Sequence, residues 1–188
     1  PICAAWGVAD DGLVVLYVGR LAKEKNMNMV VAAYIAIQAR VPSARLVLVG
    51  DGPLREALQA QCPRAVFCGI KKGAELAAHY ASGDLFLFPS LTETFGNVVP
   101  EAMASGLAVV SYNCASSADL ITHGENGLLA EPGDEARFIE AAVCAATEPA
   151  LRKTVCGAAP DSVARMSWRA VSDALAQDRK STRLNSSH

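Results

Sequence analysis

The stretch that decides the fold lies near the middle of the chain and reads Asp84-Leu-Phe-Leu-Phe-Pro-Ser-Leu-Thr-Glu93-Thr-Phe-Gly-Asn-Val-Val-Pro-Glu101-Ala-Met-Ala-Ser-Gly106. Its continuous apolar run, Leu85 to Phe88, indicates a parallel strand that is buried on both faces of a sheet. Pro89 ends this strand, because proline has no N–H to donate to a neighbouring strand. A polar loop follows, and the pattern through Met103 indicates a helix.

Two carboxylates, Glu93 and Glu101, flank the passage from this loop to the helix. In open α/β sheets, ligands bind outside the carboxyl ends of the strands, which is where both acids would lie. The alternative is that both are solvated surface acids, one of them favoured near a helix N-terminus by the helix dipole. Their spacing does not by itself decide between the two interpretations.

The composition is that of a globular domain with a sizeable core. The chain has 188 residues, of which 52% are hydrophobic and 19% charged, and this length favours one domain over two. The net charge is −2 and the cations are scattered, so we expect no nucleic-acid partner. Six cysteines without a Cys-x-x-Cys pair indicate buried free thiols in a reducing compartment, which predicts a cytoplasmic location.

Strand and helix patterns alternate along the chain. Apolar runs predict strands at residues 13–18, 45–49, 65–68, 84–88 and 107–111, and helices are expected at 26–40, 54–61, 74–82, 97–104, 119–123 and 134–147, with shorter ones after them. Asn26 or Asn28 would cap the first helix, Pro53 would open the second, and Asp134 would cap the long alanine-rich one. The alternation predicts an α/β fold, a Rossmann-like parallel sheet with helices on both faces. Right-handed crossovers then place the loops that follow the strands on one rim.

Two glycine-containing segments would lie on this rim. Gly19 and Arg20 come directly after the first strand, and Lys25 follows soon after. Glycine allows close backbone approach to a ligand, and two cations there would suit a diphosphate, although a tight turn with solvated charges is the alternative. Gly50-Asp-Gly52 lacks the third glycine of a dinucleotide fingerprint, so we interpret it as a turn. His79 is interpreted as a helix-surface residue.

These segments together resemble a known family. Gly19-Arg20 with Glu24-Lys25, Gly50-Asp-Gly-Pro53, Glu93 to Gly106 and Gly124-Glu-Asn-Gly127-Leu-Leu with Pro132-Gly-Asp resemble the retaining glycosyltransferases of family 4. This glycogen-synthase-like group carries a Glu-x7-Glu element on the two-domain GT-B fold. The likeness covers roughly residues 6–177 and is closest to bacterial GDP-mannose-dependent mannosyltransferases and to sulfoquinovosyl or related lipid glycosyltransferases.

The resemblance implies a domain organisation. The chain would be the C-terminal half of a GT-B fold, with residues 1–12 as a linker from a missing N-terminal domain and 13–178 as the donor-binding domain. Residues 179–188 are polar, without periodicity, and are expected to be a disordered tail of non-native origin. The missing domain would supply the acceptor site, so this fragment would be inactive alone. The full-length protein would associate peripherally with a membrane.

The resemblance also implies roles for individual residues. Glu93, Arg20 and Lys25 would be catalytic: the two cations would contact the diphosphate, and Glu93 would lie beside the sugar ring and face its oxocarbenium-like charge. Glu101 would accept hydrogen bonds from ribose hydroxyls. The full donor-binding set is Gly19, Arg20, Lys25, Ile70, Lys71, Glu93, Phe95, Gly96, Asn97, Val98 and Glu101. In this set the loop at Ile70 and Lys71 would lie against the base, and backbone N–H groups at residues 95–97 would lie near sugar and phosphate. The donor would be a nucleoside-diphosphate sugar, and neither a metal nor a cofactor is expected.

One departure and two alternatives remain open. Many family members carry Gly-Gly-x-x-Glu where this chain has Cys114-Ala-Ser-Ser-Ala-Asp119, which puts the donor-sugar contact there in doubt. The same fold could instead carry a nucleotide-sugar epimerase. A non-catalytic α/β binding domain, whose acids are surface groups only, is the alternative from another functional class.

Overall fold

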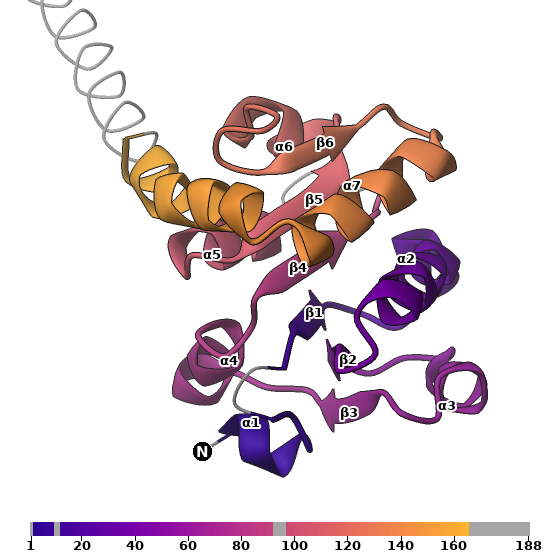
Figure 1. Ribbon diagram of the computed structural model, residues 1–188. Helices are drawn as coiled ribbons and strands as arrows, with labels where there is room; N and C mark the ends of the chain where they lie inside the picture. Colours follow the sequence, from indigo (N-terminus) through magenta and orange to yellow (C-terminus); the bar gives the residue numbers. More distant parts are fainter. Residues whose placement is uncertain (1, 10–11, 92–96, 166–188) are drawn as a thin grey trace, which may run out of the picture.

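The computed structural model describes residues 2–9, 12–91 and 97–165. Within these residues one sheet contains six strands, all paired in parallel, in the order β3-β2-β1-β4-β5-β6 (Figure 1). The strands are β1 Val14–Val18, β2 Arg45–Val49, β3 Val66–Gly69, β4 Leu85–Phe88, β5 Ala108–Tyr112 and β6 Leu128–Ala130. This confirms the predicted Rossmann-like parallel sheet.

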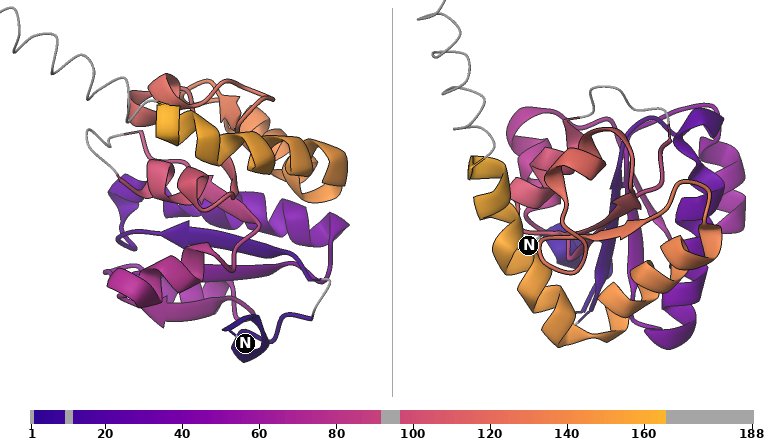
Figure 2. Two further views of the ribbon diagram at one scale, coloured as in Figure 1. Left: turned by 90° about the vertical axis from the view of Figure 1, so that its left-hand side faces the viewer. Right: turned by 90° about the horizontal axis from the view of Figure 1, so that it is seen from above.

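Helices cover both faces of the sheet (Figure 2). They are α1 Ile2–Ala5, α2 Met27–Arg40, α3 Arg55–Gln61, α4 Gly73–Tyr80, α5 Val98–Ala104, α6 Ala115–Leu120 and α7 Glu135–Thr147, with a 3-10 turn η1 at Lys23–Lys25 and helical residues at 149–165. Side chains from α2, α3 and α7 pack on one face of the sheet, and those from α4 and α5 pack on the other. Alternate residues of β1 follow the same division, because successive side chains of a strand point to opposite faces: Val15 and Tyr17 join the first cluster, Val14 and Leu16 the second.

Most predicted elements are confirmed to within two residues, and the exceptions have local causes. The expected helix at 119–123 begins earlier, as α6, and ends at Leu120. The side chain of Asn126 ends it by accepting the Thr122 N–H at 2.7 Å and donating to the Leu120 carbonyl at 3.0 Å. Pro53 lies in a turn before α3 rather than opening the helix, because the Leu54 N–H donates to the Leu21 carbonyl in the neighbouring loop.

Two polar residues behave differently from expectation. Asn26 occupies the N-cap position of α2, but its side chain makes no capping hydrogen bond and instead donates to the Pro89 carbonyl. His79 is 5% exposed rather than on the surface. Its ring lies 5.4 Å from that of Trp6, a residue of the N-terminal segment, and its Nδ1 lies 2.6 Å from the Glu75 carbonyl.

The first residues of the chain are attached to the domain. Trp6 and Val8 are buried in the same cluster as α4 and α5, so this segment packs on the sheet domain, whereas its role as a linker stays a prediction. The expected tail, 179–188, lies outside the described residues. All six cysteines are free. None of the described helices is both long enough and apolar enough to cross a membrane.

The order of the strands locates a point of reversal. From β1 the chain continues outward to β2 and β3 on one side, and β4, β5 and β6 lie on the other side. The helices that follow β1 and β4 pack on opposite faces of the sheet. A junction of this kind is the usual ligand position in open α/β sheets.

Candidate functional site

A cavity of about 420 Å³ opens at the carboxyl ends of β1, β2 and β3. It is lined by Val18, Gly19, Arg20, Val49, Gly50, Asp51, Ile70 and Lys71. Four residues of the predicted donor-binding set therefore lie together, although they come from loops 50 residues apart in the sequence: Gly19, Arg20, Ile70 and Lys71.

Backbone hydrogen bonds join the three loops that border this cavity, and we call the lining residues that they hold, Gly19, Val49 and Gly50, its floor. The Gly19 N–H donates to the Val49 carbonyl at 2.9 Å, and the Gly50 N–H donates to the Gly69 carbonyl at 2.8 Å. Gly50 has φ of 135°, and a Cβ at this position would lie 1.9 Å from the Gly19 carbonyl oxygen. Gly50 therefore does more than form a turn: only glycine lets the two loops meet. The sequence contained this signal in its Gly-x-Gly pattern, which we interpreted as a turn alone.

The backbone of Arg20 is held while its guanidinium reaches solvent. The buried Tyr17 hydroxyl donates to the Arg20 carbonyl at 3.1 Å. The guanidinium is paired with Glu24 at 3.2 Å, and the Arg20 side chain is 66% exposed. Ion pairs as exposed as this contribute under about 1 kcal/mol, so an incoming anion can replace the Glu24 carboxylate.

The opposite wall of the cavity comes from the loop after β3. Ile70 is 69% exposed, which makes it one of three large apolar side chains exposed among the described residues. Lys71 pairs with Glu75 at 3.5 Å. The wall therefore offers an apolar surface next to an ammonium group.

The remaining described members of the predicted set lie elsewhere. Asn97 and Val98 form the start of α5, and Glu101 is exposed in its first turn. Burial raises the pKa of Tyr80, and the charge of the neighbouring Glu101 raises it further. Glu101 therefore lies beside the end of α4.

The last four residues of the predicted donor-binding set include Lys25, which the structure describes, and three that it does not. Lys25 ends η1 and is half-buried, but it does not line the cavity. Glu93, Phe95 and Gly96 lie outside the described residues. The described members therefore form a cavity group and an α5 group, with Lys25 in neither, and the structure does not test the roles given to them.

One contact that the sequence did not reveal joins segments on the two sides of the strand-order reversal. The Asn26 side-chain amide donates to the Pro89 carbonyl at 3.3 Å, which links the end of η1 to the end of β4. The residues are 63 positions apart, and no local pattern signals their contact.

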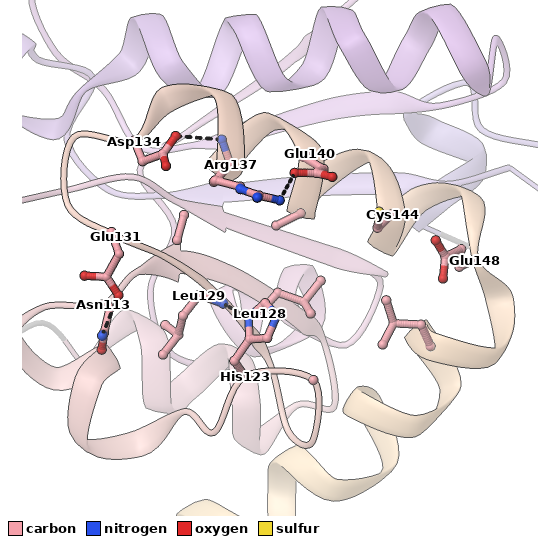
Figure 3. A pocket seen from close by; sticks show the side chains of 14 residues that line it. Asn113, His123, Leu128, Leu129, Glu131, Asp134, Arg137, Glu140, Cys144 and Glu148 are labelled. Carbon is pink, nitrogen blue, oxygen red and sulfur yellow. Dashed lines mark hydrogen bonds and ion pairs between the residues drawn. The ribbon is translucent and has the colours of Figure 1, made fainter.

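A second cavity, of about 610 Å³, lies between β6 and α7 and contains no residue of the predicted set (Figure 3). Its polar side chains largely bind one another: Arg137 pairs with Glu140 at 2.7 Å, and Asn113 donates to Glu131 at 3.1 Å. Burial raises the pKa of the Cys144 thiol, which makes this cysteine a poor nucleophile.

No cluster of three or more potential metal ligands occurs among residues 2–9, 12–91 and 97–165. The expectation that no metal takes part stays a prediction.

Comparison with known proteins relates the chain to a family of glycosyl transferases. The family model described as Glycosyl transferases group 1 matches residues 12–148. A GDP-mannose-dependent alpha-mannosyltransferase of Mycobacterium tuberculosis is 40% identical over 166 residues, which are 88% of this chain and 42% of that protein. The chain thus spans less than half the length of this relative.

Solved structures share the fold. Sucrose-phosphate synthase from Thermosynechococcus elongatus has a TM-score of 0.79 at 27% identity, with 96% of this chain and 48% of that chain covered. Anabaena Alr3699/HepE, solved in complex with UDP, has a TM-score of 0.79 at 23% identity and covers 94% and 51% of the two chains. This chain belongs to the group 1 glycosyl transferases, enzymes of the GT-B fold.

Proposed function

We propose that the chain is the donor-binding part of a retaining glycosyltransferase, which moves a sugar from a nucleoside-diphosphate sugar to a lipid or glycan acceptor. The observation that carries this proposal is the cavity at the carboxyl ends of β1–β3, where Arg20 and Lys71 stand over a floor of backbone groups. The donor would be GDP-mannose or a UDP-sugar. Support for GDP-mannose comes from the mannosyltransferase that is 40% identical.

The chemistry explains why cations are needed here. Breaking the anomeric C–O bond leaves negative charge on the departing diphosphate, and positive groups that face this charge stabilise the transition state. The planar guanidinium of Arg20 can bind two phosphate oxygens at once. In the free protein Glu24 holds the guanidinium at 3.2 Å, so the donor would exchange one carboxylate for a diphosphate. Lys25 would add a second positive charge to the diphosphate.

The other members of the set would bind the rest of the donor. The exposed Ile70 and the neighbouring Lys71 would lie against the base, and the exposed Glu101 carboxylate would accept hydrogen bonds from ribose hydroxyls. Glu93 would face the developing positive charge of the sugar. The N–H groups of residues 95–97, together with Val98, would lie beside sugar and phosphate.

The proposal extends to the parts of the enzyme beyond this chain. The chain spans 42% of the mannosyltransferase relative, and we propose that a further, N-terminal domain supplies the acceptor site. The chain alone would then bind the donor without transferring sugar, and the whole enzyme would associate with a membrane surface. The six free cysteines support a cytoplasmic location. We propose that neither a metal nor a cofactor takes part.

Calorimetric titration of this chain with GDP and with UDP tests the proposal. Arg20→Ala should weaken binding about ten- to a hundredfold, because a hydrogen bond to a charged group contributes about 1.5–3 kcal/mol. Arg137→Ala is the matched control: the Arg137 side chain is 69% exposed against 66% for Arg20, and each is paired with a glutamate of its own segment. Equal affinity of the two variants, or no binding of either nucleotide by the unaltered chain, would contradict the proposal.

A further inference from the structure

Strands β1 and β4 pair over only part of their length. Their register joins Val15 to Leu85 and Leu16 to Phe86, whereas the β1–β2 register continues to Val18. Both strands lie wholly within the described residues, and the last two residues of β1 have no registered partner on β4. At their carboxyl ends the ladder therefore no longer fixes the separation of the two strands.

Asn26 joins the two sides beyond the end of this ladder. Its side-chain Nδ2 donates to the Pro89 carbonyl at 3.3 Å, directly after β4. On the other side, its backbone N–H donates to the Lys23 carbonyl at 3.0 Å and closes η1. One residue thus binds both the turn that follows β1 and the end of β4.

The backbone of Asn26 shows that the side chain is not needed for the turn itself. Asn26 has φ of 54° and ψ of 46°, the left-handed conformation that glycine adopts most easily and that asparagine tolerates. Glycine would satisfy the turn equally well, and only an amide side chain adds the contact with Pro89. The side chain does not cap α2 either.

We propose that Asn26 is a positioning residue, which fixes η1, the turn that carries Lys25 and follows Arg20 in the chain, at a set distance from the end of β4. Helix α2, which begins directly after η1, and helix α5, which is the next described helix after β4, pack on opposite faces of the sheet. A donor that spans the reversal point, as proposed above, would contact η1 on one side and α5 on the other. The part of this inference that concerns a ligand rests on the proposed function.

Three variants separate the amide contact from the backbone conformation. Asn26→Gly keeps the left-handed turn and removes the amide, whereas Asn26→Ala removes the amide and also strains the turn. Asn28→Ala changes the same residue type at an exposed position within α2. Calorimetric titration with GDP should give about two- to tenfold weaker binding for both Asn26 variants, the range expected for one hydrogen bond, and no change for Asn28→Ala.

The melting temperature distinguishes positioning from a structural role. Asn26→Ala should melt below Asn26→Gly, yet the two variants should bind GDP equally weakly. If Asn26→Gly binds GDP as the unaltered chain does, or if affinity follows melting temperature across the variants, the proposal is overturned.

Hydrogen exchange of backbone amides tests the contact without any ligand. The Lys25 N–H donates to the Ala22 carbonyl at η1, and the Leu21 N–H donates to the Asp51 main-chain carbonyl in the loop after β2. Asn26→Gly should speed exchange at Lys25 several-fold and leave Leu21 unchanged, whereas unaltered exchange at Lys25 would refute the inference. A chain that binds neither GDP nor UDP would contradict the proposed function, and exchange at Lys25 would still decide the role of Asn26.

Discussion

Replacing Gly50 by alanine should lower the free energy of unfolding more than replacing a glycine whose Cβ position is open, because the new Cβ would disturb the floor of the cavity. The added Cβ would lie 1.9 Å from the Gly19 carbonyl oxygen, and residue 50 has φ of 135°. The left-handed backbone costs an alanine about 1–2 kcal/mol, and forcing apart two packed loops costs about 1–3 kcal/mol more. We therefore expect Gly50→Ala to lower the free energy of unfolding by about 2–5 kcal/mol. Binding of GDP should also weaken, since Arg20 follows the displaced carbonyl directly.

Gly133→Ala provides the matched control for this experiment. Gly133 also has a positive φ, 86°, but no heavy atom lies within 4 Å of the position its Cβ would take. Gly133→Ala should therefore lower the free energy of unfolding only by the cost of the left-handed backbone, about 1–2 kcal/mol. Urea unfolding followed by circular dichroism measures both free energies by linear extrapolation. Equal losses in the two variants would show that the contact between the Gly19 and Gly50 loops is not tight, and the reasoning about the floor would be wrong.

Three further predictions concern single side chains. Tyr17→Phe removes the hydroxyl that donates to the Arg20 carbonyl at 3.1 Å. This variant should lower the free energy of unfolding by about 1 kcal/mol and weaken GDP binding. An unchanged affinity would mean that this hydrogen bond does not position Arg20. Burial raises the pKa of Asp84 above its ordinary value of 3.8. The folded state therefore holds the carboxyl proton more tightly than the unfolded chain does. The free energy of unfolding should then fall as the pH rises from 3.8 through the raised pKa. Asp84→Asn should remove that fall from a series of urea titrations at different pH, and an identical pH profile would contradict the assignment. Glu101→Ala should weaken GDP binding about tenfold if its carboxylate binds ribose, whereas Glu140→Ala, which removes an exposed acid of α7, should not.

The sequence predicted those parts of the fold whose signals are local. The run Leu85–Phe88 is apolar throughout and ends at a proline, and β4 has these bounds in the structure. Asp134 was predicted to cap the long helix, and its carboxylate accepts the Arg137 N–H at 3.0 Å. In both cases the residues that determine the outcome are close neighbours in the chain.

Features that depend on distant residues were missed. His79 was interpreted as a helix-surface residue, but it is buried and its ring packs against that of Trp6, which lies 73 positions earlier in the chain. Asn26 was one of two asparagines expected to cap α2, because asparagine commonly caps helices, whereas its amide binds the Pro89 carbonyl. The cavity group could be predicted because parallel strands align the loops that follow them, but the partition between this group and α5 could not.

The loops after β1, β2 and β3 meet through main-chain N–H and carbonyl groups, those of Gly19, Val49, Gly50 and Gly69. Peptide groups are the same whatever side chains the neighbouring residues carry. Exchanges at Asp51 or Ile70 can therefore alter what the walls recognise while the base of the site keeps its shape. In this architecture, new ligand preferences can evolve without rebuilding the scaffold beneath them.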